Sequence, residues 1–406
     1  MLIKPFAALR PAPEKASTLA AVPYDVVDTA EARALAAGNP DSFLHVSRPE
    51  IDLPDSVDIH DDSVYAQGVK AFRDLQARGV LLREAGERLY VYRQVMGAHS
   101  QSGVVACCHI EDYAQDIIRK HEKTRKDKED DRTRHCQELS ANSGPVFLTY
   151  RDAATLDALV AETQRGAPLY DFTAVDGIRH TVWRVEGPAA PWVEAFGRVP
   201  LAYVADGHHR AAAAFRAGKQ RREANPGHTG AEEYNWFLAV LFPASQLRIL
   251  PYNRCVADLN GLTPASFLER VRAVFKTEPT EGAAPAGPRE VRMYLGGAWH
   301  KLTWEEFAAD PVGRLDVSVL HDRLLAPVLG ISDPRTNTRI SFVGGIRGTG
   351  ELTKRVDGGR DAVAFSMYPT TVSQMMDIAD AGQIMPPKST WFEPKLRSGL
   401  LVHTLG

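Results

Sequence analysis

Residues 201–215 constrain the fold more than any other segment, because they predict a strand, a sharp turn and a helix in direct succession. The apolar run 201–205 contains β-formers and is short enough for a buried strand. Asp206 and Gly207 interrupt it, since glycine adopts backbone angles that other residues avoid. Four alanines then favour a helix, which Gly218 is expected to end.

The first turn of this predicted helix carries His208, His209 and Arg210. Unpaired backbone N–H groups and the positive end of the helix dipole lie there, which suits an anion, phosphate above all. Arg210 can hold a phosphate through two parallel hydrogen bonds. In the alternative interpretation Asp206 caps the helix and the histidines are ordinary surface residues. The concentration of polar side chains at one strand end favours the functional interpretation.

Bulk properties exclude several classes of protein. A chain of 406 residues is long enough for two or three domains, and a net charge of -3 gives no basic field to attract nucleic acid. The cysteines lack C-x-x-C spacing, which indicates a reducing cytoplasm and no structural zinc; they are Cys107, Cys108, Cys136 and Cys255. No apolar run approaches the ~20 residues that span a membrane, so a cytoplasmic protein without a membrane partner is expected.

The order of predicted elements indicates an α+β protein. Strands are expected at 3–10, 43–46, 89–96, 104–110, 146–150, 179–185, 237–242 and 247–254, and helices at 30–37, 63–79, from 126 onward and around 156–160. A composition shift near Ala257 predicts a mixed-sheet domain at 1–256, which carries the site, and a smaller α/β unit at 257–406. In that unit Thr263 and Pro264 begin a helix. The tail at 384–402 is apolar enough to pack back on the body.

Two carboxylates are candidates for acid–base chemistry. Glu122 lies between His121 and Lys123, just after a predicted strand end, where it stays ionised and could serve as a base. Asp25 follows a proline-fixed turn and could lie at the rim of the same site. The alternatives are that Asp25 caps the helix at 30–37 and that Glu122 belongs to a solvated charged helix. The spacing H-E-x-x-H is absent, which argues against a zincin site.

Several motifs together resemble the family called domain of unknown function 1015, over nearly the whole chain. They occur in the order Pro23-Tyr24-Asp25-Val26, His121-Glu122-x-Thr124, Ala205-Asp206-Gly207-His208-His209-Arg210, Leu320-His321-Asp322 and Met385-Pro-Pro-Lys388-Ser389-Thr390. The Asp-Gly-His-His-Arg core also resembles free serine kinases in the ParB/sulfiredoxin-like superfamily, and this resemblance implies a ParB/sulfiredoxin-like mixed-sheet fold. It also implies a nucleotide site, for ATP, ADP or CTP, formed by Asp206, Gly207, His208, His209 and Arg210. A sulfiredoxin needs a cysteine in this turn, so that branch is disfavoured.

The resulting hypothesis is a nucleotide-dependent phosphotransferase, possessing kinase activity toward a small hydroxyl substrate, with free L-serine the best single candidate. Arg210 and the helix start would hold phosphates, and His208 or His209 would donate to the transferring group. Asp206 is the candidate ligand for Mg²⁺. Glu122 or Asp25 would take the hydroxyl proton. Lys388 follows a Pro-Pro corner, from which it could reach a phosphate in the same cleft.

Two other functions stay open. The first is a nucleotide-binding regulatory protein related to ParB, either non-catalytic or hydrolysing the nucleotide, although no helix-turn-helix or basic face supports binding to DNA. The second is a metal-dependent hydrolase that uses His208 and His209, with further ligands that sequence does not place. Strand ends in one sheet commonly converge, so residues 23–25, 121–124 and 206–210 are expected to surround one pocket.

Overall fold

The computed structural model describes residues 1–305, 308 and 310–406, and the chain forms two compact units. The first unit consists of Met1–Leu247 together with Pro394–Gly406, and the second of Arg248–Glu393. The sequence places a boundary after residue 256, whereas the chain enters the second unit at Arg248. The reason is that β14 (Tyr252–Val256) pairs with strands of the second unit on both of its edges.

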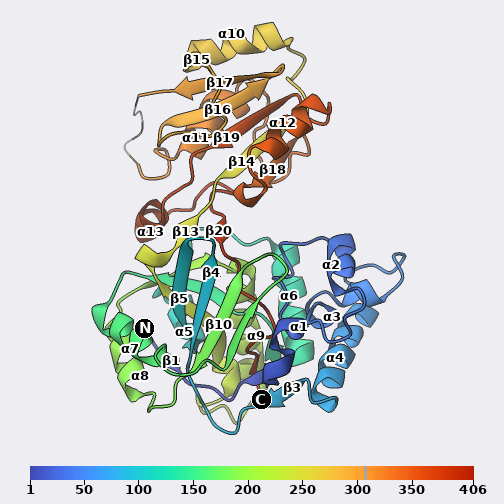
Figure 1. The fold of residues 1–406 in the computed structure, drawn as a ribbon, viewed down its shortest axis with the longest axis vertical. Coiled ribbons are helices and arrows are strands. Elements are labelled where there is room, and N and C mark those ends of the chain that lie inside the picture. Colours follow the sequence, from blue (N-terminus) through green and yellow to red (C-terminus); the bar gives the residue numbers. More distant parts are fainter. Residues whose placement is uncertain (306–307, 309) are drawn as a thin grey trace. The chain divides into compact units, whose positions relative to one another are not determined.

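A nine-stranded mixed sheet forms the centre of the first unit among the described residues (Figure 1). Its spatial order is β6 (Ile118–Arg119), β11 (Ala202–Asp206), β8 (Val146–Tyr150), β12 (Trp236–Pro243), β5 (His99–His109), β4 (Tyr90–Met96), β10 (Arg179–Arg184) and β9 (Tyr170–Thr173), with β1 (Ile3–Lys4) paired to β5. Two pairs are parallel, β6 with β11 and β8 with β12, and the other neighbours are antiparallel. The predicted mixed sheet is therefore observed.

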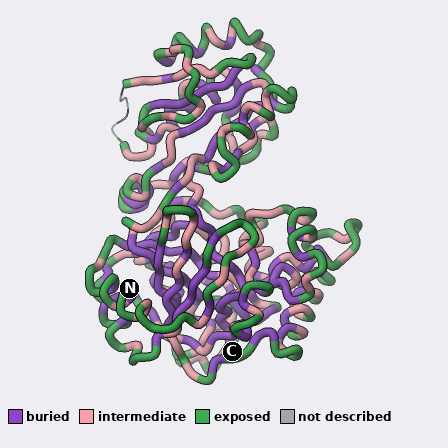
Figure 2. The backbone as a smooth tube through the Cα atoms, in the orientation of Figure 1, coloured by how far each residue is buried: buried purple, intermediate pink, exposed green. Residues whose placement is uncertain are grey.

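The core of the first unit follows from the composition of its central strands. Val104, Ala106, Leu148, Ala239 and Leu241 are almost completely buried in one cluster, and Figure 2 shows the buried backbone concentrated in these strands. Continuous apolar runs are typical of strands that are covered on both faces. The sheet is accordingly a rigid frame for the loops at its edges.

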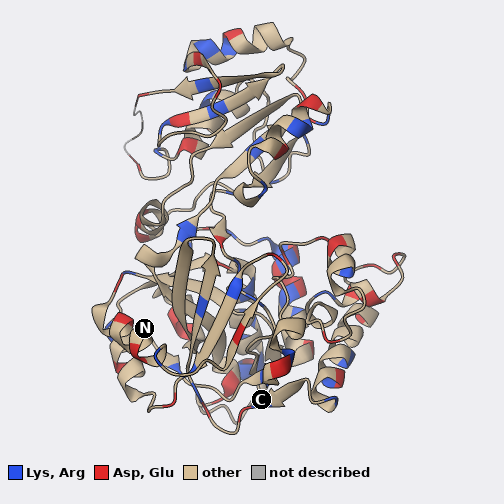
Figure 3. Ribbon diagram, viewed as in Figure 1, with Lys and Arg blue, Asp and Glu red and all other residues tan. Residues whose placement is uncertain are grey.

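Several helices of the first unit contact this sheet, and others pack in a separate apolar cluster. They are α1 (Ala16–Leu19), α2 (Thr29–Ala36), α3 (Leu44–Ser47), α4 (Asp62–Ala77), α5 (Ile110–Ala114), α6 (Lys126–Leu139), α7 (Ala154–Thr163), α8 (Ala190–Gly197) and α9 (His208–Ala224). The predicted charged helix is α6, whose alternating charges are visible in Figure 3. It packs along α9, where Arg216 pairs with Glu129 and Asp130.

The end of the chain belongs to the first unit. The amide of Leu9 donates to the carbonyl of Val402, and the amide of Ala21 donates to the carbonyl of Ser398. β21 (His403–Thr404) pairs with β7 (Ala141–Asn142), and β2 (Leu9–Pro11) pairs with β3 (Leu81–Arg83). The predicted tail is therefore divided: the part from Pro394 onward packs on the first unit, whereas residues 384–393 belong to the second unit.

The second unit is built on a six-stranded antiparallel sheet, counted over the described part of the chain. Its order is β15 (Lys276–Thr280), β17 (Ala298–Thr303), β16 (Glu290–Leu295), β19 (Val363–Met367), β14 and β18 (Ile340–Gly344). Its helices are α10 (Pro264–Val274), α11 (Asp316–Leu320), α12 (Gly350–Asp357) and α13 (Val372–Asp380), and β13 (Arg248–Ile249) pairs with β20 (Phe392–Glu393). Thr263 caps α10, as predicted. Over the described residues, no helix is both long and apolar enough to cross a membrane.

Two predicted strands are wrong in detail. Residues 43–46 form the start of α3, because Phe43 and Val46 pack into a helical cluster that overrides their local preference for strand. The run at 247–254 is split into β13 and β14, since Pro251 has no N–H to donate to a sheet ladder.

Gly218 does not end its helix, because α9 continues to Ala224. A Cβ atom at this position would lie 2.3 Å from the carbonyl oxygen of Tyr234. The glycine therefore permits the close approach of residues 233–235 to the helix. Gly218 therefore marks a close packing contact of the helix, and it does not mark the end of the helix.

We expect Gly218→Ala to destabilise the first unit by about 1–3 kcal/mol, because overpacking against a main-chain oxygen outweighs the gain in helix propensity. Gly197→Ala is the matched control, since Gly197 ends α8 and a methyl group added there would meet no described atom within 4 Å. Urea unfolding followed by circular dichroism measures both. Equal stability of the two variants would contradict the proposed contact.

Candidate functional site

The candidate site lies where two parallel strands end at the same edge of the first unit's sheet. β6 and β11 pair in parallel, with Ile118 opposite Ala202 and Arg119 opposite Tyr203. His121 follows two residues after β6, and His208 follows two residues after β11. Residues that follow parallel neighbours emerge at one sheet edge, which brings the two histidines together.

Gly207 forms the turn between β11 and α9 in the left-handed region, with φ +92°. The backbone conformation favours glycine, and a Cβ atom there would lie 3.0 Å from the guanidinium of Arg210, which would have to shift slightly. The N-terminus of α9 has no side-chain cap. Asp206 is therefore not the helix cap, and the first-turn N–H groups face the site edge.

The carboxylate of Asp206 instead binds two cations. Arg210 Nη2 donates to Asp206 Oδ2 at 2.8 Å, and Lys395 Nζ donates to Asp206 Oδ1 at 3.0 Å. Burial by itself raises the pKa of the Asp206 carboxyl, but Lys395 and Arg210 outweigh it and lower the pKa to about 2. Both oxygens are thus engaged by cations, which argues against Asp206 as a ligand of Mg²⁺.

Arg210 fixes the turn to the neighbouring strand. Its Nη1 donates to the carbonyl of Pro145, which immediately precedes β8, while its Nε has no hydrogen-bond partner among the described residues. Burial lowers the pKa of the guanidinium, but Asp25 and then Asp206 outweigh this effect and raise it. Arg210 is therefore a fixed, buried cation whose Nε makes no hydrogen bond to the described residues.

His121, Glu122 and His208 form the tightest group of chemically active side chains. Their ligand atoms all lie within 4.8 Å of one another, and the imidazole rings of the two histidines meet edge to face at 4.4 Å between centroids. Both histidines are buried and Glu122 is half-buried. Burial lowers the pKa of His121 to about 4 and that of His208 well below its ordinary value, so both rings are neutral.

His209 connects the loop after β6 to the helix start by a different contact. Its Nε2 accepts a hydrogen bond from the backbone N–H of Arg125 at 3.0 Å. Thr124 Oγ1 donates to Glu129 Oε2 at 2.9 Å, which holds the same loop against α6. The 121–125 loop is thereby anchored beside the first turn of α9.

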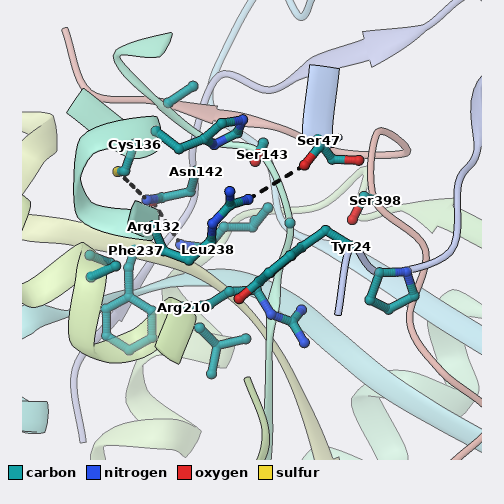
Figure 4. Close-up of a pocket in the computed structure, with 17 residues that line it drawn as sticks. Tyr24, Ser47, Arg132, Cys136, Asn142, Ser143, Arg210, Phe237, Leu238 and Ser398 are labelled. Atoms are coloured by element: carbon teal, nitrogen blue, oxygen red, sulfur yellow. Dashed lines mark hydrogen bonds between the residues drawn. The ribbon is translucent and has the colours of Figure 1, made fainter. Parts of the chain in front are cut away.

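A cavity of about 40 Å³ adjoins this turn (Figure 4). Tyr24, Arg132 and Arg210 line it with Ser47 and Ser398. The guanidinium of Arg132 lies 4.2 Å above the centre of the Tyr24 ring. This volume holds a few water-sized groups, so the cavity can take part of a ligand and not a whole nucleotide.

Asp25 is exposed beside this cavity, and its charge acts on Arg210. The expectation that it caps the helix at 30–37 is wrong. Asp28 is the cap of α2, in a reciprocal pair of hydrogen bonds with Glu31. The Asp25 carboxylate is therefore not used by that helix, and its charge acts on Arg210.

Lys388 belongs to the second unit. Its Nζ lies 5.6 Å from the centre of the Tyr252 ring, and its carbonyl accepts a hydrogen bond from Arg254 Nη2. Both contacts are within that unit, and its action on a phosphate stays a prediction. Sequence reasoning missed Lys395 in the same tail, because nothing in the local pattern indicates a partner 189 residues away.

Removing Lys395 tests the charge balance of the turn. We expect Lys395→Ala to lower the free energy of unfolding by about 1–3 kcal/mol, less than for a fully buried pair because Asp206 keeps contact with solvent. Lys70→Ala is the control, since its pair with Asp74 is exposed and contributes under about 0.5 kcal/mol. The measurement is the free energy of unfolding of both variants in denaturant. An equal decrease in the two variants would show that the Lys395–Asp206 pair contributes no more to stability than an exposed pair.

Comparison with known proteins matches most of this chain, up to residue 318, to a family model. The family model described as a protein of unknown function, DUF1015, matches residues 3–318, and no match is found among curated proteins. A free serine kinase variant in complex with AMP is 11% identical, with 74% of this chain and 92% of that chain covered and a TM-score of 0.38. SbnI with a C-terminal truncation, from Staphylococcus aureus, is 12% identical, with coverages of 73% and 86% and a TM-score of 0.38.

A conserved hypothetical protein from Pyrococcus furiosus is 13% identical, with 74% of this chain and 94% of that chain covered and a TM-score of 0.36. A free serine kinase variant in complex with ADP is also similar, at 12% identity and a TM-score of 0.36. Because all these TM-scores lie below 0.5, the activity of this chain has to be argued from its own side chains.

Proposed function

The chain belongs to the DUF1015 family, and from the geometry of its site we propose that it is a nucleotide-dependent phosphotransferase acting on the hydroxyl of a small substrate, with free L-serine the best candidate. The observation that carries the proposal is the uncapped start of α9, with Arg210 beside it and the carboxylates of Glu122 and Asp25 at the same turn. Transfer of a phosphoryl group needs positioning and charge neutralisation, together with a group that accepts the hydroxyl proton.

The phosphates are assigned to the helix start. First-turn N–H groups and the helix dipole attract an anion, and the left-handed Gly207 lets the main chain approach it closely. Arg210 adds a fixed positive charge, and its Nε supplies a donor for which the described residues offer no acceptor. His209 lies on the same turn, where its ring can donate to the transferring group. The nucleotide would be ATP or ADP, with CTP as the alternative, accompanied by Mg²⁺.

The proton acceptor is assigned to a carboxylate. Glu122 lies within 4.8 Å of the nearest imidazole nitrogens, on the loop held beside α9. Asp25 approaches the turn from the side of Arg210. In the proposed reaction, one of these two groups would take the hydroxyl proton, directly or through one water.

The proposed roles of Arg210 and of the carboxylates are tested separately, the first by nucleotide binding and the second by turnover. We expect Arg210→Ala to weaken nucleotide binding by about 1.5–3 kcal/mol, the contribution of a charged donor. Arg210→Lys is the matched control, since it keeps a cation beside Asp206 but loses the planar donor pair. Calorimetric titration of ATP, ADP and CTP, with circular dichroism to verify folding, provides the measurement. A folded Arg210→Ala variant with unchanged affinity would remove Arg210 from the nucleotide site.

The base is identified by substituting each carboxylate. We expect Glu122→Gln to bind nucleotide normally and to lose turnover, measured as O-phosphoserine formed from L-serine and nucleotide. Asp25→Asn is the companion variant that tests the second candidate. Retained turnover in Glu122→Gln would exclude Glu122. Nucleotide hydrolysis without phosphoserine in the unmodified protein would favour the regulatory function related to ParB.

A further inference from the structure

We propose that His121, Glu122 and His208 bind a divalent transition-metal ion, Zn²⁺ in the first place, at the edge where β6 and β11 end. Their ligand atoms lie within 4.8 Å of one another in the described structure, two as imidazole nitrogens and one as a carboxylate oxygen. This inference needs no phosphotransfer activity. It stands on three side chains that the topology brings to one point.

The spacing of the ligand atoms suits a single ion. Tetrahedral coordination at ~2.0–2.1 Å places ligand atoms roughly 3.4 Å apart, so small side-chain rotations are sufficient to close the group around a metal. The edge-to-face arrangement of the two rings, at 4.4 Å and 87°, makes both nitrogens approach one region without stacking.

His208 supplies a second, independent observation. Its side chain is 6% exposed, and its Nε2 has no hydrogen-bond partner among the described residues. Leaving such a nitrogen buried without a partner carries a desolvation penalty, which a metal ion at this position would remove.

The surroundings of His121 match those of a metal-binding histidine. Its ring makes a hydrogen bond with the backbone of Val204, in the adjacent strand β11. Histidines that bind metals almost always use the other ring nitrogen on a carbonyl or carboxylate, which fixes the ring orientation. The main chain of β11 would thus orient one ligand, while the helix that follows it carries another.

The ligand types select the class of metal. Two imidazoles and one carboxylate favour Zn²⁺, Fe²⁺, Co²⁺ or Mn²⁺, whereas Mg²⁺ prefers oxygen ligands alone. Three protein ligands leave a fourth position for water or for an oxygen of a bound phosphate. The proposed ion is therefore distinct from the Mg²⁺ that accompanies a nucleotide. The hydrolase hypothesis from the sequence named His208 as a metal ligand but could not place the other ligands. In the structure, His121 and Glu122 lie where those further ligands are needed.

Assigning Glu122 to a metal narrows the choice of base. A carboxylate bound to a cation is a weak proton acceptor, so Asp25 becomes the base if phosphotransfer occurs. Loss of turnover in Glu122→Gln is expected under both assignments. Metal content separates them, because only ligation predicts that this variant also loses the ion.

The test uses the full chain without nucleotide or substrate. The protein is analysed for bound metals by mass spectrometry as purified, then stripped with a chelator and titrated with Zn²⁺, Co²⁺ and Mg²⁺. We expect about one zinc ion per chain, visible absorption bands from low-symmetry Co²⁺, and no comparable affinity for Mg²⁺. Glu122→Gln and His208→Asn should each weaken Zn²⁺ binding by roughly 10- to 100-fold or more.

A control variant at a histidine outside the site keeps the test decisive, because it should retain the metal. His135→Asn tests a buried histidine whose Nε2 bonds to the Val46 carbonyl, outside the proposed site. If His208→Asn does not fold, Zn²⁺ binding by Glu122→Gln alone tests the site, because Glu122 is only half-buried.

The inference is overturned if the stripped protein takes up neither Zn²⁺ nor Co²⁺, or if Glu122→Gln binds them as tightly as the unmodified chain. Its outcome is independent of the proposed reaction. A protein that binds zinc through these residues without forming phosphoserine supports the metal site and excludes L-serine as the phosphate acceptor. A protein that forms phosphoserine and takes up neither ion gives the opposite result.

Discussion

The parallel pairing of β6 with β11 is the interaction on which the candidate site depends. β6 contains two residues, yet its register with β11 decides which side chains of the 121–125 loop face the start of α9. A slip of one residue in this pairing would displace His121 relative to β11 and separate its imidazole from that of His208. The anchoring of this loop by His209 and Thr124 therefore protects a register that so short a strand cannot hold alone.

In the turn after β11, the N–H groups at the start of α9 stay uncapped although the carboxylate of Asp206 is next to them. An aspartate before a helix commonly caps it, and a cap would occupy the N–H groups that an anion needs. Here Lys395 and Arg210 bind Asp206, so its oxygens point away from that role. The tail thus does more than cover apolar surface. Its ammonium stabilises the charge that keeps the turn in place, which explains why a segment so distant in sequence packs against β11.

The sequence predicts most local structure correctly and few long-range partners. The strand, turn and helix at 201–215, the strand at 89–96 and the charged helix α6 are encoded by local patterns that the fold does not oppose. The strand predicted at 104–110 begins earlier, at His99, because residues 99–103 pair with β4. The strand predicted at 43–46 is wrong because tertiary packing selects a helix there. The helix end predicted at Gly218 is wrong because this glycine makes room for the carbonyl group of Tyr234. Lys395 could not be predicted, since an ion pair between distant segments leaves no local pattern. The meeting of His121 with His208 was expected only as convergence of strand ends, because sequence does not reveal that β6 and β11 are neighbours.

The charges around the turn before α9 bear on whether an anion can bind there. Three carboxylates, on Asp25, Glu122 and Asp206, approach the turn, while Arg210 and Lys395 provide two cations that are already bound to Asp206. Neutral histidines add no positive charge. An anionic nucleotide would thus meet a turn at which these carboxylates outnumber these cations, and the helix dipole offsets only about half an elementary charge. A divalent ion held by His121, Glu122 and His208 would reverse the sign of this site next to the phosphates. The same residues that resemble an acid–base cluster are then better explained as the ligands that make anion binding favourable.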